Sequence, residues 1–134
     1  MLHDFKVRIL AGMAAGLLAT AAYLAPACAQ SGEPIKIGLS MSLTGPLAAN
    51  GKQALLGAKI WEEEINGKGG LIGRPVKLIF YDDQSNPSSV PGIYTKLLDV
   101  DKVDLIIAPY GTNPNAPLMP LVKQRDLLLM GNFS

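Results

Sequence analysis

The polar segment Tyr110-Gly111-Thr112-Asn113 carries the residue types in this sequence that are best suited to ligand chemistry. It follows an apolar run that is typical of a buried strand, and a second polar segment, Ser42 to Asn50, follows an earlier predicted strand. Hydroxyl and amide side chains, together with backbone N–H groups, can hold a carboxylate without a charged residue. Open parallel sheets bind ligands at the carboxyl ends of their strands, where the strand order reverses. The two segments therefore predict a ligand site at that edge.

Residues for nucleophilic or metal chemistry are scarce. The one histidine, His3, and the one cysteine, Cys28, both precede residue 30. The remainder therefore cannot form a Ser-His-Asp or Cys-His arrangement or a zinc site with these ligands. The pair Asp82-Asp83 could act in acid–base chemistry or hold a metal, but no histidine accompanies it, and we expect it to make turn and cap hydrogen bonds. The sequence predicts neither an enzyme nor a metal or other cofactor.

The glycine-rich segment from Gly67 to Gly73 is a second candidate for ligand binding. A phosphate loop follows a strand and opens a helix, so that helix N–H groups point at the anion. This segment has the reverse order, because it follows a predicted helix and leads into a predicted strand. We expect a helix cap and a turn here, since glycine adopts the left-handed conformation that such caps require.

The first 29 residues have the layout of a secretory signal peptide. Lys6 and Arg8 precede an apolar run, Ile9 to Ala25, and small residues stand at Ala27 and Ala29. A basic start, an apolar middle and an A-x-A end predict cleavage and export. A retained membrane anchor and a lipid anchor on Cys28 are the alternatives. The layout favours cleavage, which leaves residues 30–134 outside the cytoplasm with no stable membrane insertion.

Composition narrows the class of partner. The sequence contains 12 Lys and Arg against 11 Asp and Glu, and it has no basic stripe or block of like charges. Nucleic acids and anionic membrane surfaces are bound through such basic patches. We therefore expect a small-molecule ligand and no nucleic acid.

Apolar runs and amphipathic segments alternate through residues 30–134, which predicts an α/β fold with a parallel sheet, flanking helices and right-handed crossovers. Strands are expected over 35–41, 75–81, 103–108 and 127–130, and helices over 53–66, 86–99 and 115–124. We expect a Rossmann-like strand order 2-1-3-4, with Trp61 in the apolar stripe of the first helix and the third strand buried on both faces. No capping helix follows the last strand, so residues 30–134 are interpreted as an incomplete lobe.

Several motifs in this order resemble the branched-chain amino-acid-binding protein family, the periplasmic solute-binding components of ABC importers. They are Thr44-Gly45-Pro46, Ile65-Asn66-Gly67-Lys68-Gly69-Gly70, Asp82-Asp83 with Pro87, and the segment from Ile106 to Asn113. The resemblance covers essentially all of residues 30–134. It implies the first lobe of a two-lobed clamshell in the periplasm, which binds an amino acid or related small carboxylate and delivers it to a membrane permease.

The resemblance also assigns roles to individual residues. It implies that Thr112 receives the ligand carboxylate and that Asn50 stands at a pocket position that is often aromatic. Tyr110, Gly111 and Asn113 would line the pocket, and Phe133 and Ser134 would supply backbone contacts. Some members join the loops after the second and third strands by a disulfide, and here those positions are Ser85 and Gly111. Aromatic acids, amides and small organic acids stay open as ligands.

Two other function classes stay open at this point. The same fold forms the ligand-binding domain of sensors, and a signalling domain downstream would indicate that role. An exported enzyme would need a nucleophile–base pair or a metal cluster, which residues 30–134 do not offer.

Overall fold

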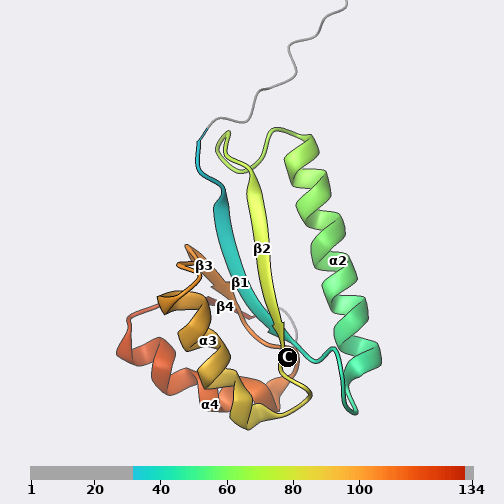
Figure 1. Cartoon of the computed structure of the whole chain (residues 1–134), viewed down its shortest axis with the longest axis vertical. Coiled ribbons are helices and arrows are strands. Elements are labelled where there is room, and N and C mark those ends of the chain that lie inside the picture. Colours follow the sequence, from blue (N-terminus) through green and yellow to red (C-terminus); the bar gives the residue numbers. More distant parts are fainter. Residues whose placement is uncertain (1–31, 132–134) are drawn as a thin grey trace, which may run out of the picture.

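The computed structural model describes residues 32–131. The predicted signal peptide and the predicted site residues Phe133 and Ser134 lie outside the described residues. The elements are β1 (Ile35–Met41), α2 (Ala48–Gly67), β2 (Val76–Asp82), the 3₁₀ turn η1 (Pro87–Ser89), α3 (Val90–Asp99), β3 (Leu105–Ile107), α4 (Thr112–Gln124) and β4 (Leu129–Met130). Figure 1 shows this alternation of strands and helices, which confirms the predicted α/β fold.

The strands form one four-stranded parallel sheet in the order β2-β1-β3-β4, as predicted. β1 pairs with β2 along its whole length, and Ile37 lies in register with Leu78 on one side and Leu105 on the other. β1 and β3 are therefore neighbours although 63 residues, 42–104, separate the end of β1 at Met41 from the start of β3 at Leu105. The chain moves to one side of β1 to form β2 and to the other side to form β3, so the order reverses between β1 and β3.

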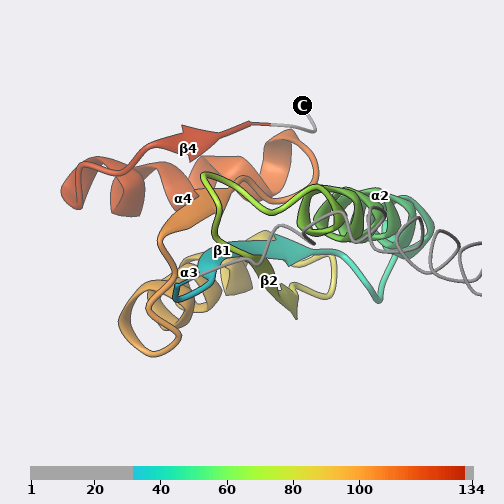
Figure 2. The same cartoon turned by 90° about the horizontal axis from the view of Figure 1, so that it is seen from above.

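The helices cover opposite faces of the sheet. α2 packs on β1 and β2, whereas α3 packs on β1 and lies against α4 (Figure 1). Seen from above, α2 and α3 lie on opposite sides of these two strands (Figure 2). This is the arrangement expected of right-handed crossovers, because β1–α2–β2 runs one way along the sheet and the later units run the other way.

Side chains alternate between two apolar cores on these faces. Leu39, Met41 and Leu55 are buried on the α2 face, and Tyr94, Leu97 and Leu118 are buried on the other.

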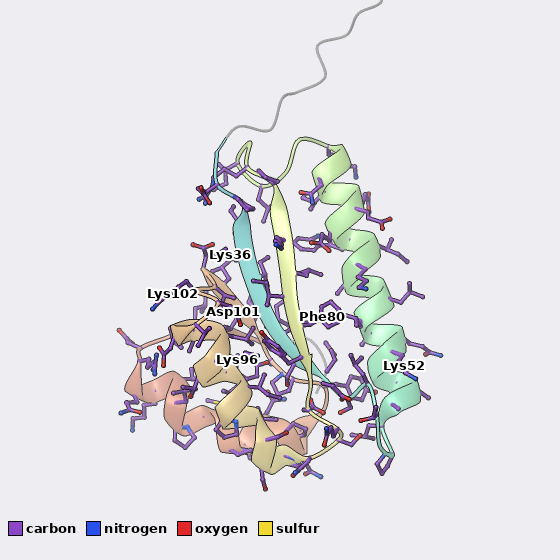
Figure 3. The ribbon with its side chains drawn as sticks, in the orientation of Figure 1. Lys36, Lys52, Phe80, Lys96, Asp101 and Lys102 are labelled. Carbon is purple, nitrogen blue, oxygen red and sulfur yellow. The ribbon has the colours of Figure 1, made fainter. Side chains whose placement is uncertain are left out.

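The successive β2 residues Phe80 and Tyr81 also face opposite sides of the sheet. The Lys59 ammonium of α2 lies 5.0 Å from the centre of the Phe80 ring, and the Lys96 ammonium of α3 lies 4.1 Å from the centre of the Tyr81 ring. Figure 3 shows Phe80 toward α2 and Lys96 on the α3 side.

Two helix starts differ from the prediction. α2 begins at Ala48 rather than at 53, because the turn at Gly45-Pro46 leads directly into Ala48 and Ala49, which favour helix. α4 begins at Thr112 rather than at 115, because Gly111 adopts a φ of 90° and turns the chain into the helix. Pro114 falls in the first turn of α4, where a missing N–H is tolerated. The predicted loop after β3 therefore ends in the first turn of a helix.

The third strand and Trp61 are more exposed than predicted. β3 spans Leu105–Ile107 only, and Leu105 is 40% exposed, whereas Ile106 is buried against α3 and α4. Trp61 is 39% exposed, so its predicted place in the core is wrong. Both results have one cause: α2 covers β1 and β2, and no described helix covers β3 and β4 on that face.

The glycine-rich segment forms the predicted cap and turn. The Gly70 N–H donates to the Ile65 carbonyl at 2.8 Å, and both Gly69 and Gly70 adopt positive φ values. A Cβ on Gly70 would lie 1.9 Å from the Arg74 carbonyl oxygen, so only glycine fits there. Among the helices within residues 32–131, none is both long and apolar enough to cross a membrane.

Candidate functional site

The carboxyl ends of β1 and β3 lie side by side and each leads into a helix. After β1 the chain passes through Ser42–Leu47 into α2, and after β3 it passes through Pro109–Gly111 into α4. The starts of α2 and α4 therefore both lie at the edge where the strand order reverses. The side chains predicted for the ligand site lie on these two connections and in the two first helical turns.

Both helix starts carry backbone N–H groups toward this edge, although the Ala48 N–H of α2 already donates to the Gly45 carbonyl at 3.1 Å. Neither α2 nor α4 has a side-chain N-cap hydrogen bond, and neither has an acidic residue in its first turn. The first N–H groups of a helix have no intrahelical acceptor, and they carry the positive end of the helix dipole. Such a helix start binds carboxylates and phosphates through the backbone.

The structure brings two of the predicted residues into contact. The Asn50 amide in the first turn of α2 donates to the Tyr110 hydroxyl at 3.0 Å, which joins the connections after β1 and β3. Tyr110 is partly buried and also packs against the α2-side core. The predicted meeting of the Ser42–Asn50 segment with the Tyr110 loop is therefore present at this pair.

Thr112 and Asn113 are exposed at the start of α4. Gly111 precedes them with a φ of 90°, a left-handed value that favours glycine. One turn later, the Asn115 amide donates to the Gly111 carbonyl at 2.7 Å and to the Pro109 carbonyl at 3.4 Å, which fixes the loop from inside. Thr112 and Asn113 thus present polar groups to solvent from a well-tethered helix start.

The expected structural role of Asp82 and Asp83 is confirmed. Asp82 accepts hydrogen bonds from the Leu43 and Thr44 amides, the Gln84 amide and the Thr44 hydroxyl. Burial by itself raises the pKa of Asp82. The hydrogen bonds from Thr44, Gln84 and Leu43 together outweigh this effect of burial and lower the pKa below its ordinary value.

Asp83 is fully buried and accepts hydrogen bonds from Ser40, Ser42 and Ser85.

Tyr94 holds the other side of β1 in place and was not singled out from the sequence as a polar anchor. Its buried hydroxyl donates to the Ile107 carbonyl at 2.5 Å and accepts from the Ser40 amide at 3.3 Å. Burial raises the pKa of Tyr94 well above its usual range, so the phenol is neutral at physiological pH. No side-chain pattern in the sequence pointed to this role, because both bonds are made to backbone groups of β1 and β3.

An apolar cavity of about 670 Å³ lies between α2, β3 and β4. The lining residues include Gln53, Ala58, Trp61, Leu105 and Met130, and none of the predicted site residues within 32–131 lines it. The cavity lies on the α2 side of β3 and β4, where no described helix covers the sheet, and it is distinct from the polar edge at the carboxyl ends of β1 and β3. Within residues 32–131, no group of three or more His, Cys, Asp or Glu side chains could hold a metal ion.

A parallel sheet whose strands lead into helix starts at its switch point is the architecture of small-molecule-binding α/β domains. The family model described as periplasmic binding protein matches residues 34–134 of this chain. The chain therefore belongs to the periplasmic binding protein family, and the resemblance found in the sequence is confirmed.

Curated relatives match in sequence. The Leu/Ile/Val-binding protein BraC3 of Rhizobium johnstonii is 32% identical over 96 residues, which cover 72% of this chain and 26% of the relative. The Leu/Ile/Val-binding protein of Escherichia coli K12 is 26% identical over 98 residues, which cover 73% of this chain and 26% of the relative. The chain thus spans about a quarter of the length of these relatives.

Solved structures match in fold. The substrate-binding protein LivJ from Streptococcus pneumoniae, determined with isoleucine, superposes with a TM-score of 0.69 at 26% identity, covering 74% of this chain and 28% of that one. A possible leucine/isoleucine/valine-binding protein from Rhodopirellula baltica gives a TM-score of 0.70 at 27% identity, covering 83% of this chain and 29% of that one. These structures share the parallel sheet with its flanking helices.

Proposed function

We propose that this chain forms part of the ligand-binding lobe of a periplasmic solute-binding protein, which captures an amino acid or related small carboxylate and delivers it to the permease of an ABC importer. Family membership and the names of the relatives support a binding role. In this proposal, residues 1–29 direct export and are removed, and residues 30–134 act in the periplasm. The proposed protein is a carrier rather than an enzyme.

The observation that carries the proposal is the pair of helix starts without a side-chain cap at the switch point, joined by the hydrogen bond from Asn50 to Tyr110. The exposed Thr112 hydroxyl and the first N–H groups of α4 would donate to a ligand carboxylate. Asn113 would line the same edge. Phe133 and Ser134, which lie outside the described residues, would add backbone contacts beyond β4. A site of neutral donors selects for an anionic group without a paired cation.

The proposal is tested by comparing L-leucine with L-leucinol, in which a hydroxymethyl group replaces the carboxylate. Saturation-transfer NMR on the purified chain detects weak ligands, which matters because one lobe encloses a ligand only in part. We expect a signal from L-leucine or another free amino acid and a much weaker signal from its alcohol. Equal signals from acid and alcohol would refute carboxylate recognition at this edge.

A further inference from the structure

Three polar residues at the end of β2 hold the connection between β1 and α2. Asp82 accepts from the Leu43 amide at 2.9 Å, from the Thr44 amide at 3.2 Å and from the Thr44 hydroxyl at 2.7 Å. Ser85 donates through its hydroxyl to the Thr44 carbonyl at 2.8 Å and accepts from the Leu47 amide at 3.1 Å. Most of the Ser42–Leu47 segment is thus tied to a different strand tip rather than to itself.

Asp83, the next residue of the chain, holds the beginning of the Ser42–Leu47 segment from the buried side. Its carboxylate accepts from the Ser42 hydroxyl at 2.7 Å, the Ser40 hydroxyl at 3.1 Å and the Ser85 amide at 3.0 Å. All three donors are neutral, and the side chain is fully buried. A buried carboxylate without its donors is costly, so these bonds fix Ser42 and Ser85 relative to each other. Asp82, Asp83 and Ser85 are called the clasp below.

Two glycines near the clasp stand where backbone segments approach closely. A Cβ on Gly45 would lie 2.7 Å from the Gln84 carbonyl oxygen, and one on Gly51 would lie 2.1 Å from the Ser42 carbonyl oxygen. Gln84 and Ser85 both adopt a φ of 57°, which disfavours side chains with a Cβ. Such strained residues persist only where surrounding contacts over-determine their conformation. The clasp supplies those contacts.

We propose that Asp82, Asp83 and Ser85 are positioning residues that set the conformation of Ser42–Leu47 and thereby the place of the α2 start beside the β3 edge. Leu47 leads directly into α2, whose first turn carries Asn50 in contact with Tyr110. The clasp therefore determines how the two halves of the proposed ligand edge meet. The consequence for ligand binding rests on the proposed function, whereas the conformational claim does not.

Amide hydrogen exchange by NMR tests the conformational claim on two variants of Thr44, which is exposed and replaceable without disturbing the core. Thr44→Val removes the hydroxyl that donates to Asp82, and Thr44→Ser keeps it. We expect Thr44→Val to speed hydrogen exchange at the backbone amides of residues 43 and 44 by roughly 3- to 10-fold, because the segment loses one hydrogen bond to Asp82. The pKa of Asp82 should rise in Thr44→Val, read from its carboxyl ¹³C shift, and stay low in Thr44→Ser.

Asp83→Asn extends the test to the buried anchor, with Asp104→Asn as its matched control. Asp104 also accepts one backbone N–H of the β1 region, that of Lys36 at 2.8 Å, but at the opposite end of the strand. We expect Asp83→Asn to speed exchange at Leu47 and Ser85, and Asp104→Asn to affect Lys36 alone. If Asp83→Asn does not fold, the two Thr44 variants decide the question.

Unchanged exchange at Leu43, Thr44 and Leu47 in folded Thr44→Val and Asp83→Asn proteins would overturn the proposal. So would an equal rise in Thr44→Ser, since that variant keeps the bond. L-leucine serves as the probe for the functional consequence: a loosened segment with unchanged leucine affinity would also count against a positioning role. If the unmodified chain fails to bind any amino acid, the proposed function fails, and the exchange data still judge the clasp.

Discussion

At the scale of single residues, Thr112 carries the sharpest prediction. Its hydroxyl is exposed at the first residue of α4, beside N–H groups that have no side-chain cap. Thr112→Val keeps the shape of the side chain and removes the donor. We expect amino-acid binding to weaken by about 1–3 kcal/mol, the cost of leaving a ligand oxygen without its partner. NMR titration measures the change, Thr112→Ser is the control that should bind normally, and an unchanged affinity in Thr112→Val would exclude the assigned role.

Asp82 makes stability depend on pH in a defined direction. Its pKa is lower in the folded chain than its ordinary value of 3.8, so the folded state prefers the ionised form. This contribution is fully present above that ordinary value and is lost as pH falls through the folded pKa. Asp99, beside Arg125, and Glu64, beside Lys68, are shifted in the same direction. The free energy of unfolding, measured by urea titration at a series of pH values, should therefore fall less steeply below about pH 4 in Asp82→Asn than in the unmodified chain. An unchanged slope would contradict the assignment.

At the scale of elements, the turn between α2 and β2 contains a residue that is poorly suited to its conformation. Leu71 and Arg74 exchange two backbone hydrogen bonds, and Ile72 and Gly73 between them have φ values of 52° and 75°. A turn with two positive φ values favours Asn-Gly, whereas Ile72 is β-branched and 94% exposed. Ile72→Asn should therefore raise the free energy of unfolding by about 1 kcal/mol.

Thermal or urea unfolding measures the effect of Ile72→Asn. Val100→Asn is the matched control, because Val100 is an exposed apolar residue with an ordinary φ of −100°. Replacing it removes exposed apolar surface without relieving strain. Equal stabilisation by both changes would show that surface polarity, and not the turn conformation, is responsible.

The elements also show how far the sequence alone leads. Periodicity and helix breakers predicted the strand order and the caps at Asn86 and Gly69-Gly70, because these depend on local chemistry and on crossover handedness. The start of α4 at Thr112 and the exposure of Trp61 were missed. The first depends on one positive φ at Gly111, and the second on which face of the sheet a helix covers. Neither is encoded in the apolar pattern of a single segment.

The candidate site was predictable to a similar degree. The sequence placed Tyr110–Asn113 and Asn50 at one sheet edge, and the hydrogen bond between Asn50 and Tyr110 agrees with that placement. The clasp was recognised only as a turn-forming acid pair, because the contacts of Ser40 and Ser42 with Asp83 are set by the pairing of β1 with β2. The ligand roles of Asn50 and of Tyr110–Asn113 stay predictions.

At the scale of the whole molecule, the uncovered face beside α2 should govern behaviour in solution. Trp61, Leu105 and Met130 line its cavity and are 39%, 40% and 58% exposed. Contiguous apolar surface of this kind drives self-association. We expect the 134-residue chain to associate as its concentration rises, observed by analytical ultracentrifugation, and Met130→Gln to reduce the association. Leu56→Gln is the control, since Leu56 is 59% exposed but lies outside the cavity, and an equal effect of both changes would contradict this account.

The most direct test of the central claim is a ¹H–¹⁵N NMR titration of the chain with L-leucine and a panel of other amino acids. We expect the amide signals of Thr112 and Asn113 to shift first, together with those of the α2 start around Asn50, while the signals around Trp61 and Leu105 stay in place. Shifts confined to the apolar cavity, or no shifts at the two helix starts with any ligand of the panel, would contradict it.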